Sequence, residues 1–395
     1  MTRSVALVDL SPPRHAVRLA VKNLSLTQFR SYARLSLDVG PEPVVLTGEN
    51  GAGKTNLLEA LSLLAPGRGL RRARLSDLCQ RGAGTQGWAV AAILRGPNGC
   101  INIGTGDITG TSGRRNIRID GADAAGQKSL AEQLHVIWLT PRMDRLFIDA
   151  PSARRRFFDR LVAGFDPGHG HRLAAYQRCM RKRAQILRAY RVDSSWLNAI
   201  EETMSEYAVA VAAARCGTLA RLNVLLKAPF GSLFPGAILE LEGSVESWLI
   251  DMPAVEAEER LRVALAEARA HDMETGGATL GPHRTDLLVR HIDYDLPAGQ
   301  CSTGEQKMLL VSIVLAHAQA QTQRSGQTPL ILLDEVMAHL DAAHRDHLID
   351  ALCVLGAQTW LTGVEADLFS SFASRAQFLT ISEGRIIDFS DRKLA

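Results

Sequence analysis

The sequence lacks most features that mark a secreted, metal-binding or membrane protein. Its 395 residues include 6 cysteines, and no two of them form a Cys-x-x-Cys pair. A disulfide framework and a zinc site are therefore not expected, and a reducing cytoplasm fits this cysteine usage. The net charge is only +3. Any surface that binds a polyanion must therefore be local.

A targeting segment is not evident either. The first twenty residues contain Asp9, Pro12 and Pro13, which interrupt any apolar core of a signal peptide. We expect residues 1–16 to form a flexible leader and the protein to be cytoplasmic, with no membrane partner. The sequence also shows no internal repeat and no low-complexity tract.

The length and the composition predict a globular chain with two domains, or one domain with a large insertion. Apolar residues make up 46% of the sequence and charged residues 22%. Short apolar and alternating runs predict strands at 17–26, 33–39, 43–47, 88–94, 100–103, 116–119, 136–139, 286–290 and 330–333. Residues 172–228 contain little glycine or proline and predict two long helices, broken near 192–195.

A glycine-rich loop follows the apolar strand at 43–47. The G-x-x-x-x-G-K-[ST] pattern is matched completely by Gly48, Glu49, Asn50, Gly51, Ala52, Gly53, Lys54 and Thr55. Glycines let successive backbone N–H groups point at phosphate oxygens, and the helix expected at 56–65 adds its positive end. We expect Lys54 to reach the β- and γ-phosphates of ATP and Thr55 to ligate Mg²⁺.

A second carboxylate motif lies far along the chain, where an apolar strand ends in Asp334 and Glu335. In a phosphate-loop ATPase, Asp334 would hold Mg²⁺ through its water shell. Glu335 would orient or deprotonate the attacking water and is the candidate catalytic residue. GTPases and RecA-like ATPases keep this strand much closer to the loop. A large insertion must therefore divide the core, and the helical stretch is the candidate.

Between these motifs stands the segment Ser302-Thr303-Gly304-Glu305-Gln306-Lys307. Ser302 and Glu305 have the spacing of a capping box. The same helix N-terminus is an anion site, at which Ser302 and the Gly304 amide could grip a γ-phosphate. In ATPases of this layout the motif contacts ATP held by a second subunit. We therefore expect an ATP-dependent homodimer with Ser302, Gly304, Glu305 and Asp341 at its interface. For Asp341, helix N-capping is an equal alternative.

Taken in this order, the motifs resemble those of ABC-type ATPases. Three further segments are similar to the RecF family, namely Gly67–Arg72, Arg154–Asp159 and Gly281–Asp286. The resemblance begins near residue 17 and runs to the C-terminus. It implies an α/β fold: an ABC-type ATPase head with a mixed sheet, a phosphate-loop core and an antiparallel β subdomain, and an inserted helical arm. We expect head lobe I at 17–150, the arm at 151–275 and the completion of the head at 276–395.

The resemblance also implies a function. RecF-like proteins bind double-stranded and gapped DNA as an ATP-dependent dimer, and with RecO and RecR they help load RecA in replication, recombinational repair and the SOS response. A weak, DNA-stimulated ATPase is expected. Two departures from the family stand out: Glu305 replaces the usual glutamine, and no histidine follows the strand expected at 358–361. The latter leaves the γ-phosphate sensor unidentified.

Clusters of arginine are the candidate DNA contacts, because they can neutralise phosphates without reading bases. The first candidates are Arg71, Arg72, Arg154, Arg155 and Arg156, and a further group is Arg178, Arg181, Lys182, Arg183, Arg188 and Arg191. Any one of them can equally be a solvated or ion-paired arginine. The alternative functions are those of another ABC-type ATPase, either a transporter subunit or an SMC-like head. The soluble insertion of long helices argues against a transporter subunit. The insertion is too short to form the coiled-coil arm of an SMC-like protein.

Overall fold

The computed structural model describes residues 17–80, 87–96, 99–107, 115–124, 126–189, 193–227 and 234–387. The expected leader, residues 1–16, lies outside this part. The chain divides into two compact units. The first combines residues 1–144, 228–235 and 303–395, and the second combines residues 145–227 and 236–302. The first unit therefore draws its elements from both ends of the chain.

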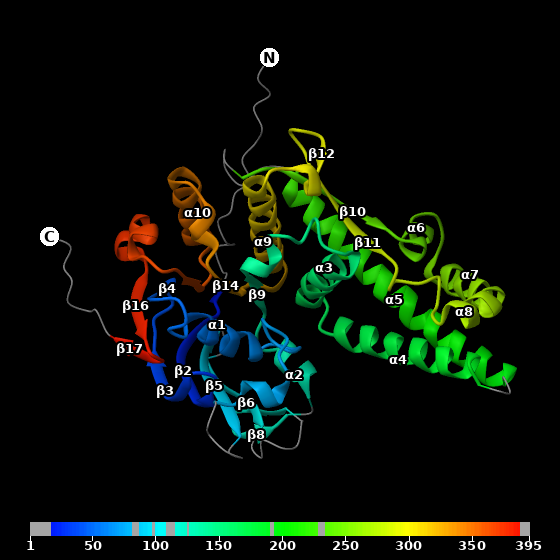
Figure 1. Cartoon of the computed structure of the whole chain (residues 1–395), viewed down its shortest axis with the longest axis horizontal. Coiled ribbons are helices and arrows are strands. Elements are labelled where there is room, and N and C mark those ends of the chain that lie inside the picture. The colour runs from blue at the N-terminus through cyan, green and yellow to red at the C-terminus, as the bar shows by residue number, and fades with distance from the viewer. Residues whose placement is uncertain are drawn as a thin grey trace. The chain divides into compact units, whose positions relative to one another are not determined.

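A six-stranded, mostly parallel sheet forms the centre of the first unit (Figure 1). The strand order is β17-β16-β4-β15-β14-β9, and only β16 and β17 pair antiparallel. The bounds are Val44–Thr47 for β4, Val136–Leu139 for β9, Leu330–Leu333 for β14, Thr359–Thr362 for β15, Gln377–Ser382 for β16 and Arg385–Ile387 for β17. The four strands β4, β15, β14 and β9 are buried along their whole length, as parallel strands covered on both faces must be. Strands from both ends of the chain build this one sheet, because β4 lies between β15 and β16.

Helices and short elements surround this sheet. The main helices are α1 (Lys54–Leu63), α9 (Thr303–Ser325) and α10 (Ala342–Leu355), with the short α2 at Gln127–Ala131. The 3-10 turns are η1 (Leu75–Leu78), η2 (Pro141–Met143), η4 (Val336–His339) and η5 (Ala366–Arg375), and β1 (Val17–Arg18) pairs with β13 (Gln327–Thr328). Helix α9 begins at Thr303, inside the segment Ser302–Lys307.

The second sheet of this unit is antiparallel, with the order β3-β2-β5-β6-β7-β8. Its strands are β2 (Ala20–Phe29), β3 (Tyr32–Asp38), β5 (Trp88–Gly96), β6 (Gly99–Asp107), β7 (Asn116–Ile119) and β8 (Ala122–Asp123). The antiparallel pairing expected for residues 88–119 is confirmed. Alternate residues such as Leu24, Leu26 and Val90 are buried, and their neighbours face outward.

Gln358 joins the two sheets and is completely buried. Its side-chain amide donates to the carbonyls of Val21 (3.0 Å) and Gly40 (2.6 Å). Its carbonyl oxygen accepts from the Val21 amide at 2.9 Å. Val21 borders a register shift between β2 and β5, so this side chain substitutes for part of a strand ladder.

The second unit is a helical body with a three-stranded sheet. Its elements are α3 (Pro151–Phe165), α4 (His169–Leu187), α5 (Ser194–Leu226), α6 (Ser244–Asp251), α7 (Ala254–Glu267), α8 (Arg269–Thr275), β10 (Ala237–Glu242), β11 (Asp286–His291), β12 (Leu296–Pro297) and η3 (Ala298–Gln300). Residues 276–302 lie in this unit and not, as the sequence suggests, in the ATPase head. The physical reason is the ladder, because β11 pairs with β10 along its whole length.

Helix α5 is long and apolar enough to cross a membrane by length and composition alone. Its buried face, with Met204, Ala208 and Ala212, packs into the core of the second unit. The same helix buries Glu201 and Arg215, which form ion pairs there. Its apolar character is therefore that of a core helix. Asp193 caps its first turn by accepting the Trp196 amide at 3.0 Å, which sets the expected break before 194.

Candidate nucleotide-binding site

The glycine-rich loop joins β4 to α1 at the carboxyl edge of the parallel sheet. Gly48, Gly51 and Gly53 all have positive φ angles, of 139°, 86° and 116°. A side chain at Gly48 would place its Cβ 2.1 Å from the Ile381 carbonyl oxygen, and one at Gly53 would lie 2.8 Å from the Tyr32 hydroxyl. The loop therefore requires glycine at these two positions for both conformation and space.

Lys54 is only 4% exposed, although it carries a charge. Its Nζ donates to the carbonyl oxygens of Gly48 (2.6 Å) and Glu49 (2.9 Å). Burial lowers its pKa, and the negative charges of Glu335 and Asp334 oppose this shift. The ammonium is thus held inside the curve of the loop, beside the helix N-terminus, where a phosphate would be its counter-charge.

The two motifs that are far apart in sequence meet at Thr55 and Asp334. The Thr55 hydroxyl donates to Asp334 Oδ1 at 2.9 Å. Burial raises the pKa of Asp334, whereas the hydrogen bonds from Thr362 and Thr55 lower it. A hydroxyl and a carboxylate side by side are oxygen donors of the kind that Mg²⁺ takes in nucleotide sites. Among the described residues, no group of three or more His, Cys, Asp or Glu side chains could hold a metal ion. A Mg²⁺–ATP site does not need such a group, because phosphate oxygens and water supply most of its ligands.

Glu335 directly follows Asp334 and is half-buried. Its backbone is left-handed, with φ 52° and ψ 28°, which is uncommon for a residue with a side chain. The Glu335 amide donates to the Thr362 hydroxyl at 2.9 Å. Strained residues of this kind cluster at functional sites, where surrounding contacts hold them.

Lys307, the last residue of the serine-glycine motif, is also buried. Its ammonium lies 3.7 Å from Asp144 Oδ2. Burial lowers its pKa, and Asp144 and Glu335 oppose this. The first turn of α9 is thus anchored to the segment after β9, within the same unit. Ser302 and Gly304 are exposed, and the space around Gly304 is open among the described residues.

Asp341 precedes α10 and is exposed. Its Oδ1 accepts the backbone amide of His344 at 2.9 Å, and its Oδ2 lies 2.8 Å from His344 Nδ1. These bonds lower the pKa of Asp341. The N-capping alternative for this residue is therefore confirmed, and its exposure still allows a contact with a partner.

The arginines at 71 and 72 lie next to the phosphate loop. Arg71 donates to Asn56 Oδ1 (2.7 Å) and to Glu59 (3.2 Å). Glu59 is completely buried in α1 and also receives two bonds from Arg30, each of 2.8 Å. Arg71 is thus held against α1. Arg72 adopts a left-handed conformation, with φ 54°.

The arginine triplet has a structural role that the sequence does not reveal. Arg154 forms two bonds to the Asp286 carboxylate (2.8 and 2.6 Å) and also donates to the carbonyls of Phe147 and Asp149. Arg155 donates to the Thr285 carbonyl at 2.8 Å. The two segments that resemble the RecF family most specifically, 154–159 and 281–286, therefore bind each other within the second unit.

Arg215 completes this junction and is 2% exposed. It forms two bonds to Asp159 (2.8 and 3.0 Å) and donates to the Pro282 carbonyl at 2.7 Å. Its charge is also shared with Glu246, 3.2 Å away. Arg156 and Arg284 are the arginines of the two segments that stay exposed. Of the candidate DNA contacts on α4, Arg183 is buried and paired with Glu201 and Asp272, and Arg191 lies outside the described residues.

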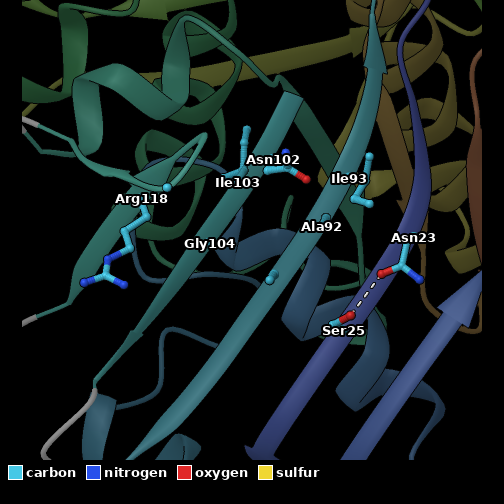
Figure 2. A pocket seen from close by; sticks show the side chains of 10 residues that line it. Asn23, Ser25, Ala92, Ile93, Asn102, Ile103, Gly104 and Arg118 are labelled. Atoms are coloured by element: carbon cyan, nitrogen blue, oxygen red, sulfur yellow. Dashed lines mark hydrogen bonds between the residues drawn. The ribbon is translucent and has the colours of Figure 1, made fainter. Parts of the chain in front are cut away.

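A shallow hollow of about 340 Å³ lies on the outward face of the antiparallel sheet. Figure 2 shows Asn23 and Ser25, joined by a hydrogen bond, on one side and Arg118 on the other. Small residues, including Ala92 and Gly104, form its floor. It contains none of the loop, acidic-strand or signature residues and is separate from the nucleotide site.

Sequence reasoning missed Thr362. Its hydroxyl bonds to both residues of the acidic pair, donating to Asp334 Oδ1 at 2.8 Å. The available signal was a threonine at the end of an apolar strand, directly before Gly363.

The fold and the site together define a phosphate-loop head of the ABC type. The family model described as RecF/RecN/SMC N terminal domain matches residues 20–385. The chain is similar to the Smc head domain with an extended coiled coil from Pyrococcus furiosus, with a TM-score of 0.53 and 16% identity over 93% of this chain and 96% of that one. The likeness to the recombination mediator protein RecF-ATPrS in the RecFOR pathway is greater, with a TM-score of 0.83 and 19% identity over 96% of this chain and all of that one.

Relatives in sequence narrow the class. The DNA replication and repair protein RecF of Mesorhizobium japonicum is 49% identical over 93% of this chain and 97% of its own length. RecF of Agrobacterium fabrum is 44% identical over 93% of this chain and 98% of its own length. The chain belongs to the RecF family of DNA replication and repair proteins. The expected ABC-type α/β fold and the resemblance to RecF are both confirmed.

Proposed function

We propose that this chain is an ATP-gated DNA-binding protein of replication and recombinational repair, which closes on DNA as a homodimer. The observation that carries this proposal is the hydrogen bond between Thr55 and Asp334, directly beneath a phosphate loop that curves around Lys54. These parts would form the nucleotide grip of an ATPase. Lys54 would contact the β- and γ-phosphates, and Thr55 and Asp334 would hold Mg²⁺, which neutralises charge on the transferred phosphoryl group.

The exposed signature residues support the shared site. Ser302 and Gly304 are open to solvent at the start of α9, so they are accessible to a γ-phosphate held by a second copy. Glu305 and Asp341 would lie at the same interface. Each dimer would then contain two sites, each built from the loop of one subunit and the signature of the other. ATP binding would close the dimer, and hydrolysis promoted by Glu335 would open it.

The DNA contacts are proposed at exposed cations. Arg156 is the exposed member of the triplet, and Arg72, which follows Arg71, is also exposed. Arg284 is a further exposed cation beside the junction of 154–159 with 281–286. Such contacts bind double-stranded and gapped DNA through phosphates, with strong dependence on salt. Arg154 and Arg155 are better explained as framework residues.

The biological setting follows from the family. The RecFOR pathway named for the related structures supports partners of the RecO and RecR type. We further propose RecA loading at single-strand gaps and a role in the SOS response. We propose the cytoplasm as the place of action. Slow hydrolysis, stimulated by DNA, would time the release of the protein from a gap.

A mixing experiment tests the shared site. Lys54→Met removes the loop's cation, and Ser302→Arg blocks the signature, so neither variant alone can assemble a complete site. A mixed dimer would contain one site with both defects and one site with none. We expect ATP hydrolysis on gapped DNA to be absent from each variant alone and to recover when they are mixed. A mixture that stays inactive, or a Ser302→Arg variant that is active alone, would contradict the shared-site model.

A further inference from the structure

Thr362 ends β15, the strand that lies between the loop strand β4 and the acidic strand β14. Its backbone pairs with Leu46, two residues before Gly48, and it is 1% exposed. Because the carboxyl ends of parallel strands share one edge, Thr362 faces the gap between the phosphate loop and the acidic pair.

The bonding of the Thr362 hydroxyl is fixed in direction. The Thr362 hydroxyl must accept the hydrogen bond from the Glu335 backbone amide (2.9 Å), because an amide N–H can only donate. Its own proton therefore goes to Asp334 Oδ1 (2.8 Å). The hydroxyl thus links the backbone of the candidate catalytic residue to the carboxylate of the candidate metal ligand.

Two effects follow from this link. Asp334 Oδ1 receives hydroxyl protons from both Thr362 and Thr55, which fixes the rotation of the carboxylate. The backbone of Glu335 is left-handed, a conformation that a residue with a side chain adopts at a cost. The hydrogen bond from its amide to the Thr362 hydroxyl helps to hold this conformation. The orientation of the Glu335 side chain depends on that backbone conformation.

A purely structural threonine behaves differently, and the same strand supplies the comparison. Thr359 is also completely buried, but its hydroxyl bonds to the Ala357 carbonyl two residues earlier, at 3.3 Å. Thr362 instead uses both its donor and its acceptor on the acidic pair. We propose that Thr362 is a positioning residue of the ATPase centre, which fixes Asp334 and Glu335 together. This inference rests on the proposed ATPase function.

The test compares three variants of the full-length protein. Thr362→Val preserves shape and removes the hydroxyl, Thr362→Ser preserves the hydroxyl, and Thr359→Val is the matched control in the same strand. Three quantities are measured for each: the kcat and KM of ATP hydrolysis on gapped DNA, the affinity for a fluorescent ATP analogue, and the lifetime of the ATP-bound dimer.

For Thr362→Val we expect kcat to fall roughly 10- to 100-fold, because a misplaced catalytic group costs about that much. KM and analogue affinity should change by less than about 3-fold, because the loop itself is unaltered. The dimer should live longer in proportion to the loss of kcat. Thr362→Ser and Thr359→Val should keep kcat within about 3-fold of the wild-type value.

Two results would overturn the inference. One is a Thr362→Val protein with the kcat and dimer lifetime of the wild type. The other is equal loss of kcat in Thr362→Val and Thr362→Ser, which would show that packing and not the hydroxyl matters. Failure of the proposed function itself looks different, because the wild-type protein would then neither dimerise with ATP nor hydrolyse it.

Discussion

Replacing Arg154 with alanine should unfold the second unit more easily and leave DNA binding by the folded protein nearly unchanged. Arg154 and Asp286 have side chains that are 13% and 14% exposed, and two charge-assisted bonds of 2.8 and 2.6 Å join them. Two carbonyl oxygens, of Phe147 and Asp149, also accept from the same guanidinium. The loss would leave a largely buried carboxylate without its cation.

The magnitude follows from these contacts. Removing one partner of a fully buried pair costs about 3–5 kcal/mol, and the slight exposure here reduces that to about 3 kcal/mol. Arg156→Ala is the matched control, because Arg156 is the next-but-one residue of the same helix and is exposed. Its removal should change stability by less than about 0.5 kcal/mol.

Chemical denaturation followed by circular dichroism measures the stability of both variants, and titration of a labelled gapped duplex at two salt concentrations measures DNA binding. We expect Arg156→Ala to weaken binding and to reduce the slope of affinity against salt, since one phosphate contact is lost. The reasoning fails if Arg154→Ala is as stable as the wild type, or if Arg154→Ala rather than Arg156→Ala reduces the salt slope.

Three further predictions concern the framework and the loop. Gln358→Leu leaves the amide and carbonyl of Val21 and the carbonyl of Gly40 buried without partners. The substitution should lower the free energy of unfolding of the first unit by about 3–5 kcal/mol. Urea denaturation followed by the fluorescence of the neighbouring Trp360 measures this, and a loss below about 1 kcal/mol would refute the joining role. Gly48→Ala should abolish binding of a fluorescent ATP analogue, because its Cβ would meet the Ile381 carbonyl oxygen at 2.1 Å. Gly51→Ala has open space and carries only the strain of its positive φ, so it should weaken binding without abolishing it; equal binding by both would contradict the steric argument. Burial raises the pKa of Cys216 to about 11, so a thiol reagent at pH 8 should label the exposed Cys100 and spare Cys216 until the protein unfolds; early labelling of Cys216 would contradict its burial.

The nucleotide site could be predicted from sequence largely because its parts are local. Gly48–Thr55 is one continuous segment, and its glycines are required by backbone angles that the pattern encodes directly. The acidic pair at 334 and 335 was recognisable as the end of an apolar strand. The structure joins these two segments through the hydrogen bond from Thr55 to Asp334.

The parts that escaped prediction depend on contacts between distant residues. The role of Thr362 needs Asp334 and Glu335 beside it, and only the strand order β15-β14 provides that. The roles of Arg154 and Arg156 differ although they are two residues apart, because only one meets Asp286. The boundary near 275 was misplaced for a similar reason, since β11 pairs back onto β10.

The central claim is that ATP joins two copies of this chain through Ser302 and the phosphate loop. Light scattering of the full-length protein with ATP and Mg²⁺, with and without gapped DNA, measures it directly. We predict that the wild type dimerises when ATP is present, that Glu335→Gln stays dimeric, and that Ser302→Arg remains a monomer while it still binds ATP. A wild-type protein that is monomeric in every condition, or a Ser302→Arg protein that dimerises normally with ATP, would contradict the account.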